Sequence, residues 1–353
     1  MNPALALARP EILTLTPYAH AAWLPSLIRL HANEAPWRPA GDCTEAGLNR
    51  YPEPQPEALV YRLADLYEVS AQAVLLTRGG DEAIDVLSRI YLRAGMDAII
   101  QCTPTFGMYQ VAAHIQGAEV IDVPLDPSRG WSVDVDRLLA AWRPRVKLVY
   151  LCSPNNPTAN SLDRGALETI CQAFDGKAMV VIDEAYIEWS QSASLTPWLA
   201  RFSTLAFLRT LSKAHALAGA RIGALLASGE LIELAKRVVP PYCLAQPTIE
   251  AALRALQPRE VAASRARLDA LRVEREYLRQ RLQSSSLVEK VWPSDTNFLL
   301  VDCLDAERFM RMSVAGGLIV RDLRRNPALP KSLRITVGTR AQNAALLRSL
   351  EAA

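Results

Sequence analysis

The sequence is poor in the residues that build disulfide frameworks and metal sites. Among its 353 residues are six widely spread cysteines without a Cys-x-x-Cys pair, and four histidines without metal-ligand spacing. Neither a disulfide scaffold nor a zinc site is therefore expected. In a chain of this length, scattered cysteines predict reduced, mostly buried thiols and a cytoplasmic protein.

Long hydrophobic runs and blocks of one charge are also missing. No apolar run has the length needed to span a bilayer, and residues 1–15 lack the basic segment of a signal peptide. The net charge of +2 comes without a basic block or an acidic tail, so neither nucleic acid nor a membrane is expected as a partner. With 50% hydrophobic and 22% charged residues, the composition is typical of a soluble globular enzyme.

The middle of the sequence alternates apolar with amphipathic segments. Continuous apolar runs predict strands at 98–102, 119–123, 146–152, 179–183, 205–209 and 222–227. Helical periodicity predicts helices at 81–93, 106–116, 163–174 and 230–238. Apolar strands separated by helices indicate an α/β fold, in which helices cover both faces of a mainly parallel sheet.

The two ends of the chain differ from this middle part. Residues 1–40 are rich in proline and predict an extended arm. The segment after residue 246 predicts a small α+β domain, with helices at 260–283, 306–315 and from 340, and strands at 298–302, 318–321 and 333–337. The length also favours more than one domain, so we predict an arm (1–40), a large domain (41–245) and a small domain (246–353).

Lys213 follows a short apolar strand and lies among hydroxyl groups. The segment 207–214 reads Phe-Leu-Arg-Thr-Leu-Ser-Lys-Ala. A desolvated lysine loses its proton readily and can form a Schiff base with a carbonyl, and Thr210, Ser212 and Arg221 are suited to hold a phosphate dianion beside it. These groups suggest pyridoxal 5′-phosphate (PLP). Taken alone, a strand-end lysine with a surface arginine is the simpler explanation.

Two other strand ends carry groups that suit a PLP ring. Asp183 closes the apolar run 179–183, and a buried carboxylate needs a strong partner such as the pyridine nitrogen. A helix N-cap explains Asp183 equally well. Asn156 lies in the proline-stiffened turn 153–158, and Tyr186 follows Asp183. Each can donate a hydrogen bond to the phenolic oxygen of PLP, although a turn without a ligand also explains Asn156.

A glycine turn and an aromatic segment complete the pattern. Gly79, Gly80 and Asp81 open the helix at 81–93, where free backbone N–H groups attract an anion. Many helices that bind no anion begin in the same way. Phe106 and Tyr109 follow the strand at 98–102; one of them can stack on a flat ring, and core packing explains both equally well.

The order of these segments resembles that of the fold-type I PLP enzymes of the aspartate aminotransferase superfamily. More narrowly, the chain resembles the histidinol-phosphate aminotransferase family over nearly its whole length. The motifs that carry this resemblance are Leu30-His31-Ala32-Asn33-Glu34, Arg50-Tyr51-Pro52-Glu53-Pro54-Gln55, Ser153-Pro154-Asn155-Asn156-Pro157-Thr158, Asp183-Glu184-Ala185-Tyr186-Ile187-Glu188, Thr210-Leu211-Ser212-Lys213 and Leu333-Arg334-Ile335-Thr336-Val337-Gly338.

The resemblance implies PLP as the cofactor and a large domain with a mainly parallel seven-stranded sheet. It implies that Lys213 binds PLP, that Asp183 pairs with the pyridine nitrogen, and that Tyr109 stacks on the ring. Asn156 and Tyr186 would hold the ring oxygen. The implied phosphate site consists of Gly80, Asp81, Thr210, Ser212 and Arg221.

The resemblance also implies a homodimer with shared active sites, whose arm packs with the small domain and the partner. Tyr51 would reach the phosphate of the neighbouring subunit's cofactor. Arg321 and Arg334 would bind the phosphate or carboxylate of the substrate, with Tyr18 and Asn33 of the arm closing over it.

The chain departs from the family pattern at two positions. Ala159 stands where a glycine usually ends the Asn-Pro turn, and His215 stands where an aromatic residue usually follows the lysine. Ala159 is expected to strain the turn if its position requires a positive φ.

The implied reaction converts L-histidinol phosphate and 2-oxoglutarate to imidazole-acetol phosphate and L-glutamate in histidine biosynthesis. An aromatic amino acid aminotransferase or a threonine-phosphate decarboxylase remains open on the same scaffold, because one arginine pair can bind either a phosphate or a carboxylate. A PLP-binding transcription regulator is a remote alternative. It would need a DNA-binding domain before the aminotransferase part, and no basic recognition helix is present.

Overall fold

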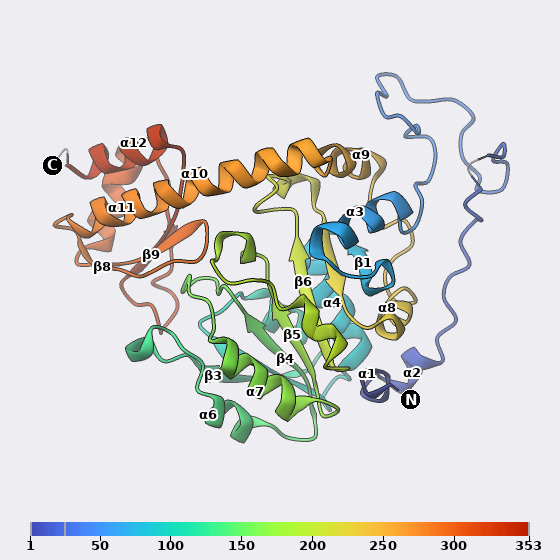
Figure 1. Ribbon diagram of the computed structural model, residues 1–353, viewed down its shortest axis with the longest axis horizontal. Helices are drawn as coiled ribbons and strands as arrows, with labels where there is room; N and C mark the ends of the chain where they lie inside the picture. Colours follow the sequence, from blue (N-terminus) through green and yellow to red (C-terminus); the bar gives the residue numbers. More distant parts are fainter. Residues whose placement is uncertain (1, 25, 352–353) are drawn as a thin grey trace.

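The computed structural model describes residues 2–24 and 26–351 and shows a large and a smaller domain connected by a long helix (Figure 1). The large domain is built on a seven-stranded sheet in the order β1-β7-β6-β5-β4-β2-β3. Its strands are Val74–Thr77 (β1), Ala98–Thr103 (β2), Glu119–Pro124 (β3), Val146–Cys152 (β4), Met179–Asp183 (β5), Leu205–Thr210 (β6) and Gly223–Leu226 (β7).

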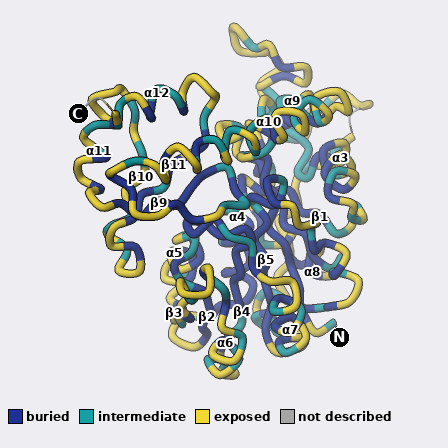
Figure 2. Tube along the Cα trace, turned by 60° about the vertical axis from the view of Figure 1, so that its left-hand side comes forward, coloured by how far each residue is buried: buried dark blue, intermediate teal, exposed yellow. Residues whose placement is uncertain are grey.

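The sheet is mainly parallel, as the sequence predicts. The strands from β3 to β6 pair in parallel, whereas β7 is antiparallel to both β1 and β6. All residues of β5 and β6 are buried, and Figure 2 shows β5 in the dark blue interior. Burial on both faces explains why the strands are apolar throughout rather than alternating with polar residues.

Helices cover both faces of this sheet (Figure 1). They are Glu57–Tyr67 (α3), Gly80–Tyr91 (α4), Met108–Ile115 (α5), Val135–Ala141 (α6), Arg164–Phe174 (α7), Gly229–Ala235 (α8) and Gln246–Ala255 (α9), with 3₁₀ turns at Ala71–Ala73, Pro127–Arg129, Ile187–Trp189, Thr196–Ala200 and Ala218–Ala220. Aspartates cap two of the helices: Asp134 accepts the N–H of Arg137, and Asp163 that of Ala166.

The small domain is a four-stranded antiparallel sheet in the order β10-β11-β9-β8. Its elements are Pro258–Gln283 (α10), Val288–Val291 (β8), Phe298–Cys303 (β9), Ala306–Ala315 (α11), Arg321–Asp322 (β10), Ser332–Thr336 (β11) and Arg340–Glu351 (α12). The strand predicted at 318–321 is therefore wrong in its bounds, because Arg321 is the residue of this segment that pairs with β11, together with Asp322 just beyond it.

The change from one hydrophobic core to the other falls within α10. Ile249 and Ala252 of α9 belong to the core of the large domain. Leu278 and Leu282 of α10 belong to the separate core of the small domain. Helix α10 therefore runs from the core of the large domain to the core of the small domain.

The beginning of the arm is more ordered than the sequence predicts. It forms the short helices Pro3–Ala6 (α1) and Pro10–Leu13 (α2), each with proline at a first-turn position, which suits a helix start. Ala4 is fully buried in the large-domain core, and the Tyr91 hydroxyl donates to its carbonyl over 3.2 Å. In the rest of the arm, the described residues as far as 56 form neither helix nor strand.

Among the described residues, no helix combines the length and the apolar character that a bilayer crossing requires.

Candidate active site

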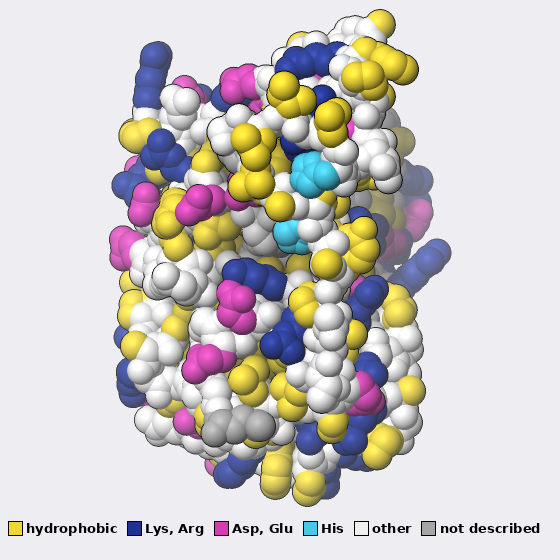
Figure 3. All heavy atoms as spheres, turned by 90° about the vertical axis from the view of Figure 1, so that its right-hand side faces the viewer, with side chains coloured by type: hydrophobic (Ala, Val, Ile, Leu, Met, Phe, Trp, Pro, Cys, Tyr) yellow, Lys and Arg dark blue, Asp and Glu magenta, His cyan; other side chains and the backbone are white. Residues whose placement is uncertain are grey.

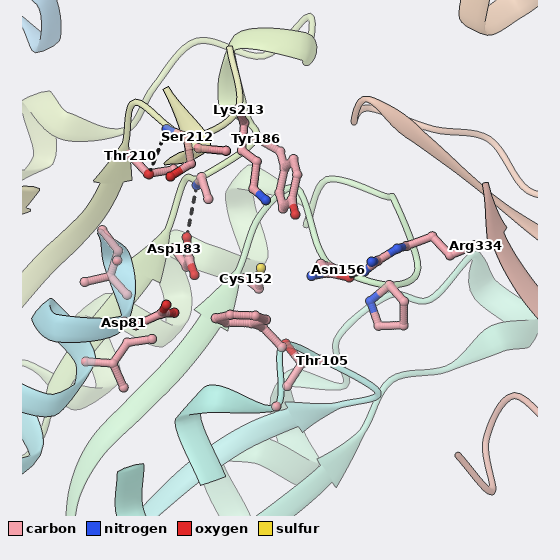
Figure 4. A pocket seen from close by; sticks show the side chains of 18 of the residues that line it. Asp81, Thr105, Cys152, Asn156, Asp183, Tyr186, Thr210, Ser212, Lys213 and Arg334 are labelled. Atoms are coloured by element: carbon pink, nitrogen blue, oxygen red, sulfur yellow. Dashed lines mark hydrogen bonds between the residues drawn. The ribbon is translucent and has the colours of Figure 1, made fainter. Parts of the chain in front are cut away.

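A cavity of 520 Å³ opens where the carboxyl ends of β4, β5 and β6 face the small domain. Loops at this edge of a parallel sheet are the usual place for ligand groups. Most of the predicted site residues line it: Gly80, Asp81, Asn156, Asp183, Tyr186, Thr210, Ser212, Lys213, Arg221, Arg321 and Arg334. Figure 4 shows Lys213, Tyr186, Asp183 and Asn156 around one common space.

The sheet register explains why these groups meet. Asp183, the last residue of β5, lies directly beside Cys152, the last residue of β4. β6 ends at Thr210, and the loop after it carries Lys213. The residues at the ends of three neighbouring strands, and in the loops that follow them, thus meet at one edge of the sheet. These segments are far apart in the sequence.

The surroundings of Lys213 favour its neutral form on balance, although the carboxylates of Asp81 and Asp183 act in the opposite direction. Burial lowers the pKa of its amino group, and the positive charges of Arg334 and Arg221 lower it further. The side chain is nevertheless exposed by surface area, because it faces the open cavity rather than the core. Its Nζ lies 5.7 Å from the centre of the Tyr186 ring.

Asp183 is a buried carboxylate held by two donors. The Tyr109 hydroxyl donates to Oδ2 over 2.6 Å, and the Ala185 backbone N–H donates to Oδ1 over 3.0 Å. Burial raises the pKa of Asp183, and the two hydrogen bonds act in the opposite direction. The helix N-cap interpretation does not apply, because the next element is the 3₁₀ turn Ile187–Trp189.

The predicted stacking role of Tyr109 is not supported by its position. Tyr109 is fully buried and is not part of the cavity lining, whereas Phe106 lines the cavity. The ring of Tyr109 stacks on that of Tyr150, with centroids 4.5 Å apart and planes 6° apart. Phe106 is therefore the aromatic residue of this segment that is available to a ring in the cavity.

The predicted phosphate site gathers at the N-terminus of α4. Arg221 donates to Asp81 Oδ2 over 3.1 Å and to Ser212 Oγ over 3.4 Å. Gly79, which precedes the helix, has φ 77°, and a Cβ there would lie 2.6 Å from the Arg221 guanidinium. Only glycine therefore fits this position. The helix N-terminus and the arginine together favour an anion.

Thr210 of the same site makes only local bonds. Its hydroxyl donates to the Ile222 carbonyl and accepts the backbone N–H of Ser212, both over 3.1 Å. These bonds shape the loop that carries Ser212 and Lys213 into the cavity (Figure 4).

Two arginines of the small domain face the same cavity. Arg321 and Arg334 are direct partners across the antiparallel pair of β10 and β11, and both line the cavity. Arg334 also donates to Asn156 Oδ1 and lies over the Phe298 ring at 5.2 Å. Like charges directly opposite each other on a sheet are unfavourable, and an anion bound between them would remove this repulsion.

Besides Tyr109, three predicted residues lie outside the cavity lining in this single chain. Tyr18 and Asn33 are exposed, and Asn33 has φ 56°. Tyr51 is half exposed and stacks on Tyr242, with ring centroids 4.7 Å apart. The face of the molecule that the arm occupies carries many hydrophobic side chains at its surface (Figure 3).

The two departures from the family pattern have visible consequences. Ala159 has φ 69° and is fully buried, so the expected backbone strain is present, because a side chain disfavours this region. His215 is buried, and neither ring nitrogen has a hydrogen-bond partner among the described residues.

Sequence reasoning missed the part that Asn155 plays in the turn. Its side-chain amide donates to the Pro104 carbonyl over 2.9 Å and to Thr158 Oγ1 over 2.7 Å, and its carbonyl accepts the Thr105 hydroxyl. Asn155 is almost fully buried, whereas its neighbour Asn156 lines the cavity. Of the two adjacent asparagines, the first fixes the turn and the second faces the ligand space. Only the resemblance to the family singled out Asn156; residue type and spacing do not distinguish the two.

Comparisons with known proteins agree with this geometry. Residues 32–350 match the family of class I and II aminotransferases. A histidinol-phosphate aminotransferase from Xylella fastidiosa is 43% identical over 350 residues, which cover 98% of this chain and 96% of that protein. A histidine biosynthesis bifunctional protein from Photorhabdus laumondii is 40% identical over 348 residues, and the chain spans 43% of its length.

Solved structures show the same fold. The histidinol-phosphate aminotransferase from Sinorhizobium meliloti, solved in complex with PLP, matches with a TM-score of 0.76 over 85% of this chain and 82% of that chain. At 24% identity this likeness establishes the fold alone. The match to the family and the full-length identity to the Xylella protein go further: the chain belongs to the class I and II aminotransferases and, among them, to the histidinol-phosphate aminotransferase family.

Proposed function

We propose that this protein transfers the amino group of L-histidinol phosphate to 2-oxoglutarate, with PLP as cofactor, in histidine biosynthesis in the cytoplasm. The products are imidazole-acetol phosphate and L-glutamate. One observation supports this substrate pair above the rest: the cross-strand arginines Arg321 and Arg334 line the same cavity as Lys213. A paired guanidinium site suits the phosphate of one substrate and a carboxylate of the other.

The residues of the cavity fit PLP. Asp183 is a buried carboxylate whose two structural donors leave lone pairs directed to the cavity, which suits a protonated pyridine nitrogen. Arg221, Ser212 and the N-terminus of α4 offer donors for the phosphate. When bound, PLP supplies the electron sink that stabilises negative charge at the substrate Cα.

Lys213 and its neighbours would perform the proton transfers. The lowered pKa of Lys213 favours a neutral amine, which can hold the cofactor covalently and, once displaced by the substrate amine, accept a proton at Nζ. Tyr186 and Asn156 line the same space and would donate to the ring oxygen. Phe106, in place of Tyr109, would stack on the ring.

Arg334 has a second function in this arrangement. Its hydrogen bond to Asn156 Oδ1 orients the amide of Asn156 with its N–H groups away from the arginine. The residue that binds the substrate anion thereby also fixes a residue that faces the cofactor. Substrate binding and cofactor positioning are coupled through this one contact.

The remaining assignments require a second subunit. Tyr51, Tyr18 and Asn33 lie outside the cavity lining of their own chain. We assign Tyr51 to the phosphate site of a partner in a homodimer, and Tyr18 and Asn33 to the part of the arm that closes over the substrate. The homodimer, and the division of the chain into an arm, a large domain and a small domain, are further parts of this proposal.

A side-by-side assay of amino donors tests the proposed substrate. With 2-oxoglutarate as acceptor, histidinol phosphate should give a kcat/KM about 100-fold or more above phenylalanine and tyrosine, because only the phosphate engages both arginines with two charges. Equal turnover of the aromatic amino acids would identify an aromatic aminotransferase. Release of carbon dioxide from threonine phosphate would identify the decarboxylase.

A further inference from the structure

Tyr109 lies behind the cavity wall with its hydroxyl on the carboxylate of Asp183. The O···O distance is 2.6 Å, and Tyr109 is fully buried. One face of its ring stacks on Tyr150, and Phe106 meets it edge-on with centroids 5.7 Å apart. Because these aromatic contacts fix the ring, the hydroxyl has little freedom to leave the carboxylate.

The second oxygen of Asp183 is fixed from another element. The backbone N–H of Ala185, in the loop after β5, donates to Oδ1 over 3.0 Å, whereas Tyr109 belongs to α5. Each carboxylate oxygen has two lone pairs, so these two donors leave acceptor positions for a group in the cavity. The direction of the free lone pairs is therefore set jointly by α5 and by the loop.

We propose that Tyr109 is a positioning residue for the pairing of Asp183 with the pyridine nitrogen of PLP. The inference rests on the proposed function, because it requires the ring nitrogen to meet Asp183. Tyr109 does not line the cavity, so it acts only through the carboxylate. By donating to the charged form, it favours carboxylate over carboxylic acid and thereby leaves the proton on the ring nitrogen.

The surroundings of Asp183 make this donor important. Burial raises the pKa of the carboxyl group, and the negative charge of Asp81 acts in the same direction. The hydrogen bonds from Tyr109 and Ala185, together with the positive charge of Lys213, lower it. Tyr109 is thus one of few groups that oppose protonation of Asp183.

The two stacked tyrosines provide a matched pair of variants. Tyr109→Phe removes the hydroxyl that bonds Asp183 and keeps the aromatic stack. Tyr150→Phe removes a buried hydroxyl from the other ring of the stack, and that hydroxyl has no hydrogen-bond partner among the described residues. Both variants lose one oxygen from the same aromatic pair, and only one of them alters Asp183.

To test this proposal, PLP labelled with ¹⁵N at the ring nitrogen is added to the wild type and to each variant. The ¹⁵N resonance reports the protonation of the ring, and equilibrium dialysis gives the dissociation constant of PLP. In Tyr109→Phe the resonance should move toward the unprotonated position, and the dissociation constant should rise about 10-fold, the loss typical of one hydrogen bond to a charged group. Tyr150→Phe should match the wild type in both measurements.

The outcomes separate this inference from the proposed function. If the wild type binds no PLP, the proposed function fails and the inference falls with it. If the wild type binds PLP and both variants leave the resonance unchanged, or shift it equally, Tyr109 contributes only packing. Should Tyr109→Phe not fold, fluorotyrosine at position 109 keeps the hydroxyl and makes it a stronger donor; an unresponsive resonance then overturns the inference.

Discussion

The cavity and the arm differ in how far a single chain buries their side chains and supplies them with hydrogen-bond partners. Around the cavity, Asp183 and Thr210 are buried at strand ends and Asn156 in the turn after β4, and all three already have hydrogen-bond partners. Along the arm, Ile28 and Leu30 are about nine-tenths exposed. The cofactor side of the site is thus formed within the single chain, whereas the arm displays apolar surface that folding of this chain does not bury.

Backbone bonding explains this difference. The strand ends belong to a sheet in which each central strand pairs with two neighbours. Because the backbone is fixed on both sides, the positions of the side chains at these ends are also fixed. The arm is fixed at its start by Ala4 in the large-domain core and further along by Glu34, which pairs with Arg29 and Arg50. Between α2 and Glu34 its described residues form neither helix nor strand, so the position of this part depends on what packs against it.

The largest effect is expected at the centre of the cavity. Lys213→Ala should lower kcat by about 10³-fold or more, because it removes both the covalent attachment and the general base. The matched control is Lys177→Ala, a lysine outside the cavity lining, which should keep wild-type kcat. Borohydride reduction and peptide mapping of the wild type should place the pyridoxyl group on Lys213. A label on Lys177 or Lys236 would refute the assignment.

The next effect concerns Arg321 and Arg334, which form the small-domain wall of the cavity. Arg334→Lys should lower kcat/KM for histidinol phosphate by about 30- to 1,000-fold, corresponding to roughly 2–4 kcal/mol for one charge-assisted contact. Histidinol, which lacks the phosphate, should be a poor substrate that the change affects much less, since for it only the contact of Arg334 with Asn156 is altered. Arg325→Lys, at an exposed arginine outside the cavity lining, is the control. Equal losses on both substrates would show that Arg334 is structural.

A mixing experiment tests whether the arm side of the site comes from a partner. Tyr51→Phe and Lys213→Ala subunits should each be inactive alone. If Tyr51 serves the neighbouring cavity, each mixed dimer has one site with both lesions and one intact site. An equimolar mixture after subunit exchange should then regain about a quarter of wild-type activity, since about half of the dimers are mixed. Exchange confirmed by mass spectrometry without any recovery would place Tyr51 in its own cavity.

Some elements of this structure can be predicted from the sequence because burial of a strand or helix requires a recognisable order of apolar residues along the chain. The strands Val146–Cys152 and Met179–Asp183 have the predicted bounds, since a strand covered on both faces is apolar from end to end. The helix Ala306–Ala315 was likewise predicted with its observed bounds. The polar residue that closes each such strand is a good candidate for a site residue.

Other features depend on which neighbour a residue meets, and the sequence does not contain that information. Phe106 and Tyr109 are both aromatic and lie one helical turn apart, and only packing shows that one faces the cavity and the other Asp183. The segment 318–321 looks like a strand, but the observed strand consists of Arg321 and the following residue, Asp322. The short helices of the arm form because Ala4 finds a place in a distant core.

The smallest expected effect is a shift in the pH dependence of PLP capture. Covalent capture requires the neutral amine of Lys213, whose fraction rises as the pH increases through its pKa. Because burial, Arg334 and Arg221 lower this pKa, the capture rate should reach its plateau at a lower pH than it would with a lysine of ordinary pKa.

Arg334→Gln removes one of the positive charges, so the pKa of Lys213 should rise and the midpoint of the rate profile should move to higher pH. Arg325→Gln should leave the midpoint in place, because that arginine lies outside the cavity lining. Stopped-flow absorbance of apo-protein mixed with PLP measures both profiles. An unmoved midpoint in Arg334→Gln would mean that the small-domain wall does not influence the lysine, and that the cofactor side of the site is electrostatically independent of the substrate side.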